Sequence, residues 1–228
     1  ANPTGEFYIE VLQNARFWGF VLNSTIVGLV ATTLVILLSV LGAYSLARFR
    51  FPGSQELANT VLFIYMVPPV LLAIPIYIWM YNLGLLNSRV GVIFAHVARG
   101  LPFALWMLRG FFANLPRQLE DAARTDGCTW LGVIWRVILP LSGPGVVAVA
   151  TYTLILSWND YVMAFMLLTE GRMQTLPVGL IALFEGGDTL EWGQIMAGSI
   201  LSAIPVMVFF FLVQKLMVRG LTAGAVKG

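Results

Sequence analysis

The stretch from Phe17 to Ala47 contains no charged residue, and this property constrains the fold more than any other feature of the chain. A helix needs about 20 largely apolar residues to cross a bilayer, so this run is long enough to span one with tilt. Charged residues make up only 11% of the sequence and hydrophobic residues 59%, whereas a soluble domain carries about 25% charged residues. We therefore predict an all-α, polytopic integral membrane protein.

Four further apolar stretches follow, so five spans are expected, at about residues 17–47, 56–81, 88–112, 145–168 and 195–216. The second is interrupted by Pro68-Pro69 and by Pro75. Helix breakers are tolerated at membrane depth only where neighbouring elements or a water-filled cavity satisfy the freed backbone. Polar segments lie between the spans, at about residues 114–140 and 169–193. We expect residues 1–228 to form one transmembrane domain without a soluble domain or a repeat.

The basic residues predict the orientation, because cytoplasmic loops carry an excess of Lys and Arg. Placing residues 48–56, residues 109–143 and the C-terminus in the cytoplasm puts most of the basic residues on that side. The segment 169–193 is then external, and so is Ala1. We therefore expect a multi-pass protein of the cell membrane with a cytoplasmic C-terminus, and a further transmembrane helix before Ala1.

Residues 114–140 contain the densest charged island of the sequence. Pro116 suits the first turn of a helix and Gly127 suits its C-terminal end. On that helix one face, rich in small residues, combines Leu119, Ala122, Ala123 and Asp126. A second short helix is expected from about Thr129 to Pro140. A helix lying flat on the membrane surface is the alternative that composition leaves open.

The spacing of residues in this charged island resembles a known sequence pattern. The pattern E-A-A-x3-G-x9-I-x-L-P is typical of the cytoplasmic loop of permeases in binding-protein-dependent ABC importers. This chain has Asp121-Ala122-Ala123, Gly127, Val137 and Leu139-Pro140 in the same register, with Asp for Glu and Val for Ile. It also resembles the carbohydrate branch of these permeases, and within it the six-span, maltose-type subunit of a heterodimer. The residues that carry this likeness are Asn23-Ser24, Phe51-Pro52-Gly53, Trp158-Asn159-Asp160 and the ending 220–228.

The resemblance implies the transmembrane domain of a type I ABC importer, which moves a carbohydrate into the cytoplasm by alternating access, with a small oligosaccharide as the expected cargo. It implies four kinds of partner besides the lipid bilayer: a second permease subunit, two cytoplasmic ATP-binding subunits, an extracytoplasmic solute-binding protein and the carbohydrate itself. ATP and Mg²⁺ would be bound by the ATP-binding subunits, since this chain has no G-x4-G-K-[ST] phosphate loop. We therefore expect no catalytic residue and no cofactor in this chain.

The resemblance also implies which residues dock on the ATPase. Residue by residue, the docking set would be Glu120, Asp121, Ala122, Ala123, Asp126, Gly127, Leu139 and Pro140. In relatives the C-terminal tail reaches toward the ATPase dimer, so Lys227 is a further candidate.

Ionisable side chains at membrane depth are functional candidates, because burying them is costly. His96 and Arg99 are three residues apart and share one face of the third span. We hypothesise that Arg99 pairs with Asp160 or borders the translocation path with it. The other candidates for that path are Trp106, Trp158, Asn159 and Tyr161. An ion pair that only packs helices, and an Arg99 that snorkels to the outer interface, are the alternatives.

Other functions fit the sequence less well. A net charge of only +2 does not favour a nucleic-acid partner. The lone His96 lacks the neighbouring ligands of a metal site, and the spans lack the residue constellations of intramembrane enzymes. An ion-coupled secondary transporter would usually show inverted repeats, which we do not find. A glycerophosphodiester or another polar solute is the alternative cargo within the same ABC branch.

Overall fold

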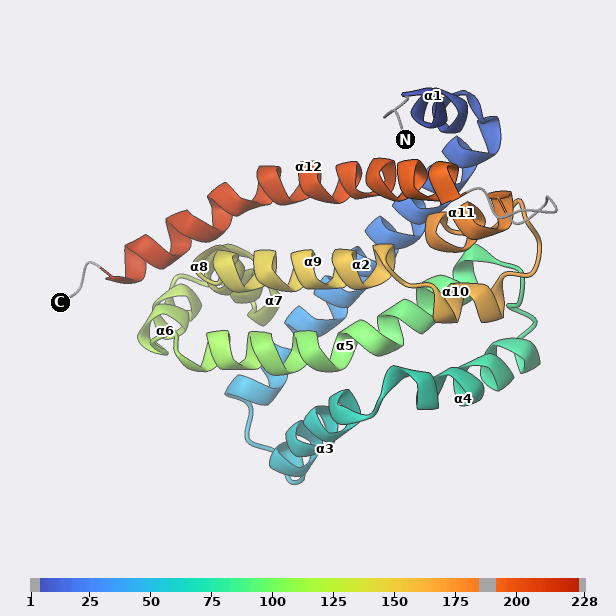
Figure 1. Cartoon of the computed structure of the whole chain (residues 1–228). Coiled ribbons are helices and arrows are strands. Elements are labelled where there is room, and N and C mark those ends of the chain that lie inside the picture. The colour runs from blue at the N-terminus through green and yellow to red at the C-terminus, as the bar shows by residue number, and fades with distance from the viewer. Residues whose placement is uncertain (1–4, 185–191, 226–228) are drawn as a thin grey trace. The chain divides into compact units, whose positions relative to one another are not determined.

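The computed structural model describes residues 5–184 and 192–225, and every regular element within them is a helix. The predicted all-α fold is therefore confirmed for this part of the chain. The four longest helices lie in four of the five apolar stretches of the sequence (Figure 1). They are α2 (Ala15–Arg48), α5 (Arg89–Ala113), α9 (Gly143–Trp158) and α12 (Trp192–Ala225). The short helix α1 (Glu6–Gln13) precedes α2. The tail residues 226–228, with Lys227, lie outside the described residues.

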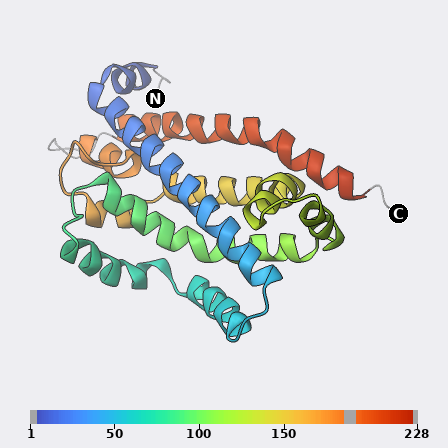
Figure 2. The ribbon, with the colours of Figure 1, turned by 180° about the vertical axis from the view of Figure 1, so that it is seen from behind.

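Helix α2 is one uninterrupted element, as the view from behind makes clear (Figure 2). It includes the whole charge-free run and ends at Arg48, the first basic residue after that run. The turn that follows contains Gly53, whose φ of 84° lies in the left-handed region that glycine adopts without strain. Helix α3 (Ser54–Met66) begins directly after it.

The expected second span is divided into two helices. Helix α3 ends before Val67, whose backbone is extended, and α4 (Pro69–Asn82) begins at the second proline of the pair. A residue before a proline is disfavoured in the helical region, so the break falls at this position. Pro75, in contrast, lies inside α4 without ending it.

Within residues 5–184 and 192–225, three helices are long and apolar enough to cross a membrane: α2, α5 and the part of α12 up to Val213. Two further pairs of helices satisfy the same test when each bent pair is taken as one span, which raises the number to five. The first pair is α3 with α4, and the second joins residues 130–141 to α9. Five membrane spans are thus compatible with the described helices.

The expected fourth span, residues 145–168, contains two helices. Helix α9 ends at Trp158, and α10 (Val162–Leu167) begins three residues later. The physical reason lies in Asp160, whose Oδ2 accepts a hydrogen bond of 3.0 Å from the backbone N–H of Ala164. The carboxylate thereby satisfies an N–H group of the first turn of α10, which a helix leaves unpaired. Helix α11 (Leu176–Phe184) lies within the segment expected to be external.

The chain forms two compact units, each built from three segments. The first unit combines Ala1–Ala31, Pro68–His96 and Leu154–Phe210, and its core includes Phe17, Phe20 and Trp158 packed with Leu176 and Leu180. The second unit combines Thr32–Val67, Val97–Thr153 and Phe211–Gly228. Its most deeply buried large side chains include Tyr44, Leu108, Phe112 and Ile138.

Candidate functional site

The charged island folds into helix α6 (Gln118–Thr125) and a tight turn in the second unit. The two acidic residues Glu120 and Asp121 occupy the first turn, where the helix dipole favours negative charge. Gly127 follows the helix with a φ of 87°, and its N–H donates to the Arg124 carbonyl at 3.0 Å. Glycine is favoured at such a left-handed helix end. The expected helix between Pro116 and Gly127 is therefore present, with its glycine in the expected role.

A second group of helical turns follows at once. Helix α7 (Trp130–Val133) continues into the π-helical turn η1 (Ile134–Ile138) and then α8 (Leu139–Leu141). Thr129 caps α7, its Oγ1 accepting from the Gly132 N–H at 3.1 Å. The helical turns end at Leu141, one residue beyond Pro140, where the sequence places the end of this helix.

Helix α6 and the turn after it present an open face that includes small residues. Leu119, Asp121, Ala122, Asp126 and Gly127 are exposed. Ala123 is half-buried, as is Leu139, while Pro140 is exposed. A surface with two alanines and a glycine lets the backbone of another protein approach closely. Most members of the predicted docking set therefore lie where a partner can reach them, and their contact with an ATPase stays a prediction.

Glu120 differs from the rest of the docking set because its side chain is buried. Its Oε1 lies 2.5 Å from Nε of Arg48, and only 6% and 7% of the two side chains are exposed. Its Oε2 accepts a 2.8 Å hydrogen bond from the Tyr44 hydroxyl. Arg48 also donates from Nη2 to the Leu115 carbonyl at 3.0 Å. The carboxylate of Glu120 thus joins α6 to the C-terminal end of α2 within the second unit.

A row of rings makes a second connection between α2 and α6. The ring of Phe49 meets Tyr44 and Trp130 edge to face, at centroid distances of 5.9 and 5.4 Å. The guanidinium of Arg124 lies 4.5 Å from the centre of the Trp130 ring, a cation–π contact. Arg124 also donates to the Cys128 carbonyl at 3.0 Å. Helix α6 is therefore attached on two sides.

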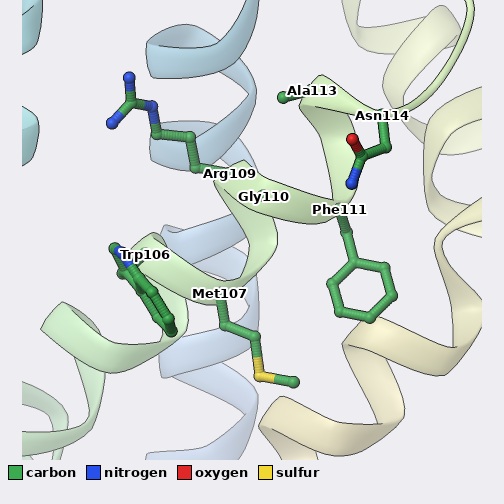
Figure 3. Close-up of a pocket in the computed structure, with 7 residues that line it drawn as sticks. All are labelled: Trp106, Met107, Arg109, Gly110, Phe111, Ala113 and Asn114. Carbon is green, nitrogen blue, oxygen red and sulfur yellow. The ribbon is translucent and has the colours of Figure 1, made fainter.

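The end of α5 carries a hollow of about 490 Å³ in the second unit (Figure 3). Trp106, a candidate for the translocation path, lines it and is 51% exposed. Arg109 also lines it and donates from Nη2 to Oε1 of Gln55 on α3 at 3.1 Å. The remaining lining residues are Met107, Gly110, Phe111, Ala113 and Asn114.

Three of the other path candidates line a second hollow, of about 340 Å³, in the first unit. Trp158, Asn159 and Tyr161 form one part of it, and residues of α11 and α12 complete it, among them Ser199 and Ser202. The indole N–H of Trp158 donates to the Ser202 carbonyl at 3.1 Å. The hollow thus combines aromatic rings with hydroxyl and amide groups, the mixture typical of sites for small polar molecules.

Asp160 has a different environment from these neighbours. Its Oδ2 lies 3.2 Å from Nε2 of His96, and the two side chains are 3% and 0% exposed. Nδ1 of His96 lies 2.7 Å from the Ser157 hydroxyl oxygen. Which of His96 Nδ1 and the Ser157 hydroxyl donates in this contact depends on the imidazole tautomer. Serine, histidine and aspartate are also the residue types of a hydrolytic triad, but here all three side chains are buried. The cluster links α5, the end of α9 and the segment before α10 within the first unit.

Arg99 belongs to the second unit and is half-buried. Its proposed pairing with Asp160 stays a prediction, as does the role of both in a translocation path. Among the described residues, no group of three His, Cys, Asp or Glu side chains is placed to hold a metal ion.

The N-terminal part of α2 holds the segment 172–176 in place within the first unit. The Asn23 amide donates to the carbonyls of Arg172 and Gln174 at 3.0 and 2.8 Å, and its oxygen accepts from Nε of Arg89 at 3.0 Å. The hydroxyl oxygen of Ser24 accepts from the Leu176 N–H at 2.8 Å. We call this set of contacts the Asn23 clamp. It gives a structural reason for the Asn23-Ser24 pair that contributed to the sequence resemblance.

Residues 36–223 match the family described as the binding-protein-dependent transport system inner membrane component. The chain belongs to this family. It is 36% identical over 228 residues to the inner membrane ABC transporter permease protein YcjP of Escherichia coli (strain K12), covering 99% of this chain and 81% of that protein. It is 36% identical over 230 residues to the trehalose/maltose transport system permease protein MalG of Thermococcus litoralis, covering 100% and 82%.

A solved structure has the same fold as this transport-system component. It is the crystal structure of a bacterial ABC transporter involved in the import of the acidic polysaccharide alginate. The match has a TM-score of 0.79 at 25% identity, and it covers 92% of this chain and 78% of that chain. The recognition of an ABC importer permease from the Asp121-Ala122-Ala123 register is therefore confirmed, together with the type I transmembrane fold.

Sequence reasoning missed two partnerships in this permease. It treated His96 as isolated, whereas the structure pairs it with Asp160 and Ser157. The available signal was that two ionisable residues at membrane depth favour each other as partners. It also treated Glu120 as an exposed neighbour of Asp121. The signal there was Arg48 at the end of a long apolar helix, where a charge needs a partner or water.

Proposed function

We propose that this permease is the transmembrane subunit of an ATP-driven importer that moves a carbohydrate, most simply a small oligosaccharide, into the cytoplasm. The observation that carries the proposal is the open face of α6, which presents the Asp121-Ala122-Ala123 motif and Gly127 in a chain of the binding-protein-dependent family. The name of one relative refers to trehalose and maltose, and the transporter of similar fold imports a polysaccharide. Both support a carbohydrate cargo.

In this proposal ATP is hydrolysed by two separate cytoplasmic subunits, and one of them docks on α6. The basic residues of the loops and the C-terminus favour the cytoplasmic side for this helix. Closure of the ATP-binding subunits would displace α6 and turn the spans between inward-open and outward-open arrangements. A second permease subunit would complete the pathway, and an extracytoplasmic solute-binding protein would deliver the sugar.

The hollow beside Trp158, Asn159 and Tyr161 is the proposed place where this subunit contacts the sugar. Aromatic rings offer flat apolar faces, and the Asn159 amide supplies both donors and acceptors for hydroxyl groups. Asn159 is exposed, so its amide is accessible. Arg99, Trp106 and Asp160 are proposed to border the remainder of the path.

Reconstitution tests the proposal. The chain is assembled in proteoliposomes with its second permease subunit and the ATP-binding subunits, and the solute-binding protein is added outside with labelled maltose or trehalose. We expect uptake that requires both enclosed ATP and the binding protein. Uptake driven by a proton or sodium gradient without ATP would contradict it. Asn159→Ala should lower uptake while ATP hydrolysis continues, and Asn82→Ala, at an exposed position of α4, serves as the control.

A further inference from the structure

We propose that Glu120 is a positioning residue that couples α6 mechanically to the transmembrane helix α2, through Arg48 and Tyr44, and is not itself a docking residue. This inference rests on the proposed function, because it requires that α6 receives the movement of an ATP-binding subunit. It assigns different tasks to two neighbouring acidic residues. Asp121 lies on the open face. Glu120 lies in a buried set of contacts with Arg48 and Tyr44, which we call the joint.

The first step of the argument is the direction of the two side chains. Asp121 is exposed, whereas Glu120 is 5% exposed and uses both of its carboxylate oxygens inside the second unit. A carboxylate that already pairs with a guanidinium and accepts from a phenol has little capacity left for another protein. Docking through Glu120 would require this buried pair to open.

The second step is that Arg48 connects α2 both to the first turn of α6 and to the segment before that helix. Arg48 pairs with Glu120 on the helix and donates to the Leu115 carbonyl in the segment just before it. Both bonds come from one guanidinium, whose fork is rigid and planar. The start of α6 is therefore held by the last turn of α2 as well as by the chain segments on either side of it.

The third step is that the aromatic row restricts rotation of α6 about this point. Phe49 follows directly after α2, and its ring contacts Trp130, over which Arg124 of α6 lies. The helix is thus held by its first turn through Glu120 and by its last turn through Arg124. A helix attached at both turns moves with α2 as one body, as transmission of force requires.

The decisive experiment compares transport with ATP hydrolysis in the complete importer carrying Glu120→Gln. The substitution keeps size and hydrogen bonding and removes the charge that pairs with Arg48. We expect the complex to assemble and to hydrolyse ATP, while the amount of solute imported per ATP falls about tenfold, within the range of coupling effects between sites. Glu56→Gln, at an exposed position of α3 in the same unit, should leave this ratio unchanged.

Two further variants separate coupling from folding. Tyr44→Phe removes one hydroxyl from the joint and should lower the same ratio to a smaller degree, so the inference stays testable if Glu120→Gln fails to assemble. The exchange Arg48→Glu with Glu120→Arg should recover part of the ratio lost by Glu120→Gln, which a role in contact with the ATPase would not allow.

The outcomes are distinct. If Glu120→Gln and Tyr44→Phe both keep the wild-type ratio, or if Glu120→Gln releases the ATP-binding subunit while Tyr44→Phe changes nothing, Glu120 is not a coupling residue. If the wild-type complex itself imports nothing with ATP, the proposed function fails first.

Discussion

The two ends of helix α2 are fastened in different ways. Near its N-terminal end, Asn23 and Ser24 bond to backbone groups of residues 172–176 and so fix the course of a chain segment. At its C-terminal end, Arg48 pairs with the side chain of Glu120. Most partners of Asn23 and Ser24 in the clamp are backbone carbonyl and N–H groups that substitution does not change, with Arg89 the one side-chain partner among these contacts. The joint depends on two opposite charges that must both be present.

This difference has an energetic consequence. A hydrogen bond between neutral groups contributes about 1 kcal/mol to stability. Removing one member of a buried ion pair costs about 3–5 kcal/mol, because the other charge is left without a partner. The clamp can therefore lose one hydrogen bond and keep its other contacts. In the joint, removing either charge leaves the other charge buried without its partner. An all-or-none contact suits a part that must transmit movement.

The largest effect is expected for Arg48→Ala. It leaves the buried carboxylate of Glu120 with only the Tyr44 hydroxyl, so the free energy of unfolding of the purified protein should fall by about 3–5 kcal/mol. Chemical denaturation in detergent measures this. Arg50→Ala removes an exposed arginine two residues further on and should change stability by no more than about 0.5 kcal/mol. Equal effects of the two substitutions would show that the joint is not stabilised by its charge pair.

An intermediate effect is expected for Asn23→Ala. The substitution removes three hydrogen bonds of the clamp, which together should lower the free energy of unfolding by about 2–3 kcal/mol. It also frees the backbone near Arg172, an exposed residue, so trypsin should cut there faster than in the wild-type protein. Ser24→Ala removes a single bond and should show a weaker form of both changes. Unchanged cleavage at Arg172 in Asn23→Ala would contradict the clamp.

The smallest effect is expected for Tyr44→Phe. Phenylalanine fills the same space but donates nothing to Glu120, so a loss of about 1.5–2 kcal/mol is expected for a hydrogen bond to a charged group. Tyr77→Phe, in a half-buried position of α4, provides the matched comparison and should have little effect. A loss with Tyr77→Phe as large as with Tyr44→Phe would mean that the hydroxyl bond at the joint contributes nothing particular.

The sequence predicted those parts of the fold that depend on residues close together in the chain. The charge-free run became α2 because an apolar stretch of that length must satisfy its backbone in a helix. Gly127 was placed at the helix end because glycine is favoured there, and its left-handed backbone agrees. The division at Pro68-Pro69 likewise follows from the restricted backbone of the prolines. These features depend on neighbours within one or two helical turns.

Features that depend on distant residues could not be predicted. The break after Trp158 was not predicted, because hydropathy shows only how apolar a stretch is. It does not show that the Asp160 carboxylate accepts a hydrogen bond from the Ala164 N–H. The inward direction of Glu120 depends on Arg48 and Tyr44, which approach it only when the second unit is folded. The contact between His96 and Asp160 was missed for the same reason, because the two residues are far apart in the sequence. The contacts of Glu120 and His96 are pairings between separate segments, which one sequence does not reveal, whereas the bond between Asp160 and Ala164 is local and hydropathy does not record it.

The central claim is that the open face of α6 receives an ATP-binding subunit and drives import. The most direct test is ATP-dependent uptake by the complete importer carrying Ala122→Arg. A large side chain on this small-residue face should prevent close approach and lower uptake at least about tenfold, which corresponds to about 1.4 kcal/mol. Ala122→Ser, which keeps the side chain small, should transport like the wild type. Full uptake by Ala122→Arg would contradict the account.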